Sequence, residues 1–124
     1  MIGATGSNSN TGAAYVFTGS GGTWTQQAKL TAADAAANDR FGVSVAVSGS
    51  TAVVGAYGKN SNTGAAYVFT RSGSNWTQQA ELTASDGTGG DDFGFSVALS
   101  GSTAAAGAPF KNASTGAAYV FANV

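Results

Sequence analysis

The side chains of this sequence best suited to binding a cation are aspartates that gather shortly before two Phe-Gly pairs. They are Asp34, Asp39, Asp86, Asp91 and Asp92. In the second group, residues 86–92, glycines could expose backbone carbonyls beside three carboxylates, so Asp86, Asp91 and Asp92 are a candidate calcium site. The alternative is turn chemistry, in which Asp side chains accept hydrogen bonds from loop amides and Gly supplies positive φ. The first group lacks the glycines, and we favour turn chemistry, with no cofactor.

Few side chains in this sequence could support catalysis. The chain contains no Cys and no His, which removes thiol nucleophiles, imidazole catalysis and zinc sites with those ligands. Asp91 and Asp92 could in principle act as an acid–base pair, but adjacent side chains in a loop usually point apart. No GxSxG elbow occurs. We therefore expect no catalytic residues and no enzymatic activity.

Aromatic residues recur at matching places along the chain. They are Trp24 and Trp76, and Tyr15, Tyr67 and Tyr119. One interpretation is an aromatic platform for sugars. The other, which exact recurrence favours, is packing between repeated units, where aromatics bury a large area.

Composition narrows the classes of partner. The 124 residues carry a net charge of -1, and only 9% are charged. Five basic residues cannot form a patch that follows a phosphate backbone, so we expect no nucleic-acid binding. No apolar run approaches the length of a membrane span, so we expect no membrane insertion.

An internal repeat positions all of these residues. The segment TGAAYVF occurs at 11–17, 63–69 and 115–121, a spacing of 52 residues each time. Residues 11–62 and 63–114 align without a gap, with 34 identities in 52 positions. Such a repeat indicates one supersecondary unit used again.

The period divides into four short strands by alternation of apolar and small residues. We expect strands at 41–49, 51–57, 64–70 and 75–83, with a two-residue hairpin at Gly49-Ser50. Tyr67 and Phe69 should face one side of the third strand, and Ala66 and Val68 the other. No stretch has helical periodicity. Four antiparallel strands per repeat are typical of a β-propeller blade, whose large face packs on a small face of the next blade.

The motif residues resemble the FG-GAP repeat family. The resemblance rests on Phe41, Gly42, Gly55, Ala56, Phe93, Gly94, Gly107, Ala108 and Pro109. Tyr57 stands in place of the first proline. The resemblance implies a propeller like the head of integrin alpha subunits, an extracellular or cell-surface location, and a role in adhesion or ligand display. Many integrin-type repeats carry a calcium loop between the first two strands. Here the connections 48–50 and 100–102 hold no carboxylate, so those calcium sites do not carry over.

The phase of the strands predicts an incomplete propeller. Residues 1–34 form a partial blade of three strands, 35–86 a complete blade, and 87–124 a second partial blade. About two and a half blades cannot close a propeller of four to eight blades. The chain must therefore be a propeller fragment or assemble with other copies, and we expect a homo-oligomer, with a ring favoured over a filament. Its role would be a non-enzymatic structural repeat module. The rival is a lectin-like or integrin-like domain that binds a glycan or protein ligand.

Overall fold

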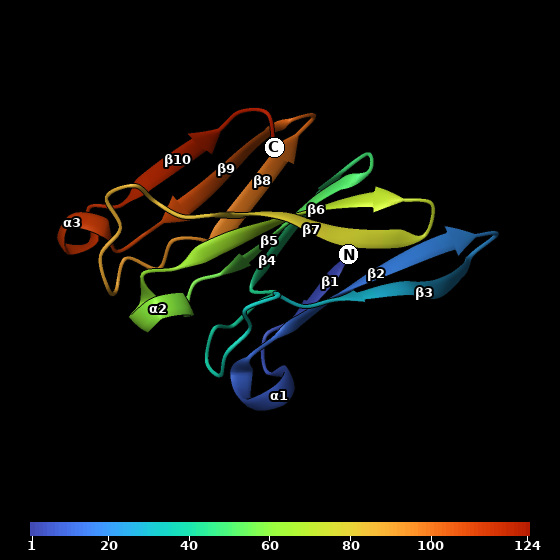
Figure 1. Cartoon of the computed structure of the whole chain (residues 1–124), viewed down its shortest axis with the longest axis horizontal. Coiled ribbons are helices and arrows are strands. Elements are labelled where there is room, and N and C mark those ends of the chain that lie inside the picture. Colours follow the sequence, from blue (N-terminus) through green and yellow to red (C-terminus); the bar gives the residue numbers. More distant parts are fainter.

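The chain folds into three antiparallel sheets that follow one another in sequence order (Figure 1). The computed structural model describes all residues 1–124. The first sheet holds β1 (Ile2–Ala4), β2 (Ala13–Ser20) and β3 (Thr23–Leu30). The middle sheet holds β4 (Ser44–Ser48), β5 (Thr51–Ala56), β6 (Ala65–Ser72) and β7 (Asn75–Leu82). The last sheet holds β8 (Ser96–Ser100), β9 (Thr103–Ala108) and β10 (Ala117–Phe121). The all-β prediction is confirmed.

The middle sheet contains the four expected strands in meander order. Gly49-Ser50 is the two-residue loop between β4 and β5, since Ser48 pairs with Thr51. Gly49 takes φ +58°, which is why glycine suits this position. The β2–β3 pair of the first sheet and the β6–β7 pair of the middle sheet each shift register by one residue at a bulge, after Val16 in β2 and after Val68 in β6.

One local feature differs from the sequence-based expectation. The strand expected from Phe41 begins only at Ser44, because Gly42 turns the chain at φ +95° and Phe41 makes an isolated bridge to Gly12. Three single turns also appear, α1 (Ser7–Asn10), α2 (Lys59–Asn62) and α3 (Lys111–Ser114). Each holds three residues at positive φ, so none is a regular helix.

Alternation along the strands produces two separate cores. Tyr67 and Phe69 of β6 lie in the core between the first and middle sheets. Ala66 and Val68, on the opposite face of the same strand, lie in the core between the middle and last sheets. The face prediction for this strand is confirmed. Each interface joins a face rich in aromatics to a face of Ala, Val and Leu, so large side chains fill the space that small ones leave.

The three sheets form an open row, and no closed propeller is seen (Figure 1). The turns α1, α2 and α3 all lie at the same end of their sheets (Figure 1). None of them approaches the length or apolar character that a membrane-crossing helix needs.

Candidate functional site

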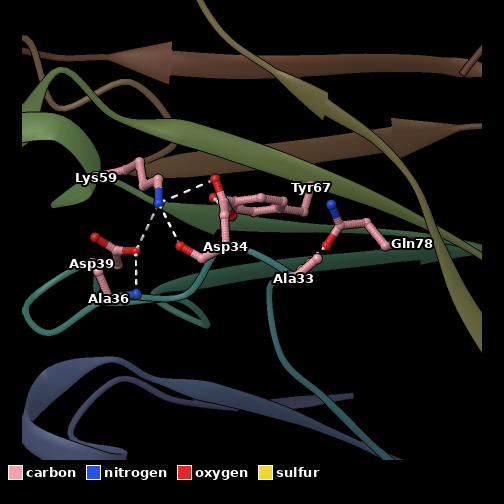
Figure 2. Close-up of polar contacts among 7 residues, drawn as sticks. All are labelled: Ala33, Asp34, Ala36, Asp39, Lys59, Tyr67 and Gln78. Carbon is pink, nitrogen blue, oxygen red and sulfur yellow. Dashed lines mark hydrogen bonds and ion pairs between the residues drawn. The ribbon is translucent and has the colours of Figure 1, made fainter.

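A buried lysine joins the middle sheet to the loop that leads into it (Figure 2). The Lys59 ammonium, from α2, lies 3.1 Å from Asp34 Oδ2 and 3.3 Å from Asp39 Oδ2. It also donates to the Asp34 carbonyl oxygen at 2.7 Å. Asp34 and Asp39 belong to the connection between β3 and β4. The ammonium therefore lies among two carboxylates and a carbonyl, a ligand set that would also suit a hard cation.

The remaining contacts of this lysine cluster fix its carboxylates. Asp39 Oδ2 accepts a hydrogen bond from the Ala36 amide at 3.0 Å, and Tyr67 donates its hydroxyl to Asp34 Oδ1 at 2.9 Å. Burial alone would lower the pKa of Lys59, but the hydrogen bond to Asp34 and the two carboxylate charges hold it above its usual value. Burial opposes ionisation of Asp34, yet the hydrogen bonds from Tyr67 and Lys59 keep its pKa below normal. Burial and the bond to Asp34 raise the pKa of Tyr67.

The same cluster recurs 52 residues later. Lys111 Nζ lies 3.1 Å from Asp91 Oδ2 and 3.7 Å from Asp86 Oδ2, and it donates to the Asp86 carbonyl oxygen. Tyr119 donates to Asp86 Oδ1 at 2.8 Å, and Thr88 donates its amide to Asp91 at 2.9 Å. The hydrogen bond from Tyr119 lowers the pKa of Asp86, and the Thr88 amide and Lys111 lower that of Asp91.

The three candidate calcium ligands are thus only partly brought together. Asp86 and Asp91 share the Lys111 ammonium, whereas Asp92 makes neither of these ion pairs. Asp92 is buried at φ +59°, and burial and the charge of Asp91 raise its pKa. No group of three acidic side chains is arranged to hold one metal ion. Asp91 and Asp92 also have separate surroundings, which is unlike an acid–base pair around a substrate.

The Phe-Gly pairs make the closest contacts between sheets. Phe41 and Phe93 are 1% and 0% exposed, one in each core. A Cβ at Gly55 would overlap the carbonyl oxygen of Gly94, so the two backbones meet directly. Ser44 Oγ donates to that same oxygen at 2.9 Å. The Phe-Gly turn of one sheet therefore packs directly against the preceding sheet.

The other motif residues complete this junction. Gly42 and Gly94 donate their amides to the carbonyls of Gly55 and Gly107 within their own sheets, at 2.9 and 3.0 Å. Ala56 and Ala108 are fully buried, while Pro109 is only half-buried. The motif residues thus act through backbone geometry and small size.

The aromatics occupy unequal environments in spite of their equal sequence positions. Trp76 is partly buried against the first core and donates its indole N–H to Gln27 Oε1 at 3.0 Å. Trp24, its equivalent in the first sheet, is 71% exposed. Tyr67 is fully buried, whereas Tyr15 and Tyr119 are half-buried.

The glutamine pairs of β3 and β7 are more than a solvated edge. Besides the bond from Trp76 to Gln27, the Gln78 side chain accepts the Ala33 amide at 3.0 Å. Each bond links the first sheet, or the loop after it, to the middle sheet. Gln27 and Gln78 therefore help to join neighbouring sheets.

Sequence reasoning missed the two lysines. Their recurrence could have indicated a structural role, because Lys59 and Lys111 are the only basic residues that recur at the spacing of 52. Their partners Asp34 and Asp86 recur at the same spacing. Position 7, the equivalent place in the first sheet, holds Ser instead.

Comparison with protein families identifies the repeat. A family model described as FG-GAP repeat matches residues 24–69 and 76–121. The chain belongs to the FG-GAP repeat family. No match is found among curated proteins. FG-GAP repeats indicate a propeller-type repeat module, and the family is generally non-enzymatic and typically extracellular. Each matched unit runs from the last strand of one sheet through three strands of the next, so it contains one complete lysine cluster loop and one Phe-Gly turn.

Proposed function

We propose that this chain is a non-enzymatic structural module whose sheets serve as blades of a propeller-type assembly built from several copies. The assembly would serve an extracellular, adhesion-type role, as is typical of the family. One observation carries the proposal. Each buried interface joins a face of large residues to a face of small ones. One outer face of the row carries the same large residues, and the other carries the same small residues.

The outer face of the first sheet is the large-residue half. Its members are Ile2, Tyr15, Phe17 and Trp24, and their equivalents 52 residues on are Val54, Tyr67, Phe69 and Trp76. The equivalents pack in the core between the first two sheets. Ile2 itself is 60% exposed. An apolar surface of this kind is unfavourable in water and marks an interaction site.

The outer face of the last sheet is the small-residue half. Ala105, Ala118 and Val120 are the equivalents of Val53, Ala66 and Val68, which lie in the second core. Val120 is 73% exposed, whereas Val68 is 1% exposed. A second copy offers the matching large face, so repeated stacking would bury both. Closed rings leave no such face exposed, which favours a ring over a filament.

Sedimentation velocity tests this proposal. We expect the unmodified chain to sediment as a multi-chain species, and Val120→Glu to shift it towards single chains because a charge would be buried. Ser74→Glu, in an exposed turn away from both faces, is the matched control and should behave as the unmodified chain. A single-chain species for the unmodified protein would contradict the proposal.

A ligand-binding role is the second candidate, and one feature favours it. Trp24 borders an apolar hollow of about 390 Å³ with Met1, Ile2 and Phe17. Apart from the Trp24 indole N–H, the lining offers no polar group to orient sugar hydroxyls, so assembly explains the hollow better than a glycan does. Loss of binding to a glycan or protein by Trp24→Ala, with the assembly intact, would reverse this preference.

A further inference from the structure

We propose that two copies exchange segments. The last sheet of one copy binds β3 and the middle sheet of a second copy, and the second copy releases its own β1–β2 hairpin. The inference rests on the self-association proposed above, and it changes the face that docks: the large face of the middle sheet, with Tyr67 and Phe69, takes the place of the outer face of the first sheet. Three open features of the last sheet carry it, and each has a filled equivalent inside the chain.

The first feature is the outer edge of β10. Strands β2 and β6 each pair with a following strand, but β10 pairs only with β9. In the first two sheets the register is the same: Val16 lies opposite Ala28, and Val68 opposite Ala80. An open edge recruits an extended strand through its free backbone groups. Strand β3 of a second copy fits, with Val120 opposite Ala28.

The second feature is an unoccupied site into which a Phe-Gly turn would pack. In the middle sheet, Ser44 and Gly55 hold the carbonyl of Gly94 from the next sheet. Their equivalents in the last sheet, Ser96 and Gly107, line an open hollow with small residues. Gly42 of a second copy would supply the missing carbonyl once the first sheet of that copy no longer covers it.

The third feature is a row of free carbonyls in and after α3. The carbonyls of Ser61, Asn62 and Thr63 accept the amides of Gly90, Asp92 and Phe93 from the next sheet, at 2.8–3.2 Å. The equivalent carbonyls of 113–115 accept no hydrogen bond. In the second copy the matching donors are the amides of 38, 40 and 41. These donors now bond to the carbonyls of 9–11, so the exchange replaces each bond with an equivalent one.

The released hairpin is well suited to exchange. The shared segment TGAAYVF leads into β2 at 11–17 and into β10 at 115–121, so β3 finds the same residues in either strand. The hairpin carries Ser7 where the other sheets carry a clustered lysine, so its release breaks no ion pair. Residues 1–23 also lie outside the segments matched by the family model. The exchange converts two three-stranded sheets into one four-stranded sheet, and each chain then contributes two complete sheets.

Cysteine cross-linking tests the register directly, because the chain has no cysteine of its own. Separately purified Val120→Cys and Ala28→Cys chains are mixed and oxidised. We expect disulfide-linked pairs between the two variants, since directly opposed residues lie about 5 Å apart. Lys29→Cys, whose side chain points to the other face of β3, is the matched control and should link only at background level.

A backbone variant provides the second arm. A methyl at Gly107 would lie 2.5 Å from Ser96 Oγ within one chain, a hydroxyl that can rotate away, but it would overlap the docked Gly42 carbonyl, which is fixed backbone. We expect Gly107→Ala to weaken association by about tenfold or more with unchanged unfolding of the dilute chain, and Ser102→Ala to have no effect.

The outcomes separate the two proposals. A multi-chain mass could be found without the Val120–Ala28 cross-link and with association intact in Gly107→Ala. That result would overturn the exchange, and self-association would then occur by simple stacking of outer faces. A single-chain mass would overturn both.

Discussion

Replacing Phe93 with Ala should be the most damaging single truncation at the junction between the middle and last sheets. Phe93 is completely buried, and its ring centroid lies 5.4 Å from that of Tyr119 and 6.0 Å from that of Phe121. Truncating a buried Phe costs about 3–5 kcal/mol, and that range includes the cavity left behind. Two edge-on aromatic contacts are lost as well, which places the expected loss in the upper half of that range, about 4–5 kcal/mol.

Phe95→Ala is the control, because Phe95 lies two residues away and is 47% exposed. Its main partner is Tyr57, with centroids 5.4 Å apart, so we expect a loss of only about 1 kcal/mol. Urea unfolding followed by tryptophan fluorescence measures both variants, with equal slopes confirming that the midpoint reports stability. Losses of similar size for the two variants, or a loss below about 2 kcal/mol for Phe93→Ala, would refute the packing argument.

Four further outcomes follow from the structure. Trp76→Ala should lower the free energy of unfolding by about 2–4 kcal/mol because it removes a partly buried indole and its bond to the first sheet, whereas Trp24→Ala should change the unfolding of the single chain little; equal effects in dilute urea melts would contradict this. Lys59→Met should cost about 1–2 kcal/mol by leaving Asp39 unpaired, discounted because Asp34 remains half open to water; an unchanged urea midpoint would contradict it. Calcium should barely change the melting temperature, and a clear rise over a chelator control would revive the candidate site at Asp86, Asp91 and Asp92. The lowered carboxyl pKa values stabilise the fold above the unfolded pKa of about 4, so stability should fall as pH drops below it. The raised pKa values of Lys59 and Lys111 stabilise below the unfolded pKa of about 10.4, so a second loss is expected as pH rises through their folded values; a flat pH profile of the urea midpoint would contradict both statements.

The strands were predictable because alternation and turn glycines act locally. The four strands of the middle sheet, the hairpin at Gly49-Ser50 and the two faces of β6 all follow from residues within a few positions of one another. The family was predictable as well, since its motif repeats in order. Local pattern alone did not show that Phe41 lies before β4, because its position depends on a glycine turn received by the preceding sheet.

The lysine clusters were not predicted because their members are distant in sequence. Lys59 lies 20 and 25 residues from Asp39 and Asp34, and only the packing of the loop against the next sheet brings them together. The aspartates were therefore considered without their cation. Likewise, equal spacing could not show that Trp24 is exposed while Trp76 is partly buried, since the difference arises from a neighbouring sheet that covers only one of them.

Light scattering on the unmodified chain, coupled to size-exclusion chromatography across a range of concentrations, shows whether the chain self-associates. We expect a folded species with a mass that is a whole-number multiple of 12.1 kDa, at least two chains, because the apolar outer face of the last sheet must be covered. A folded and stable species at 12.1 kDa across the whole concentration range would contradict it.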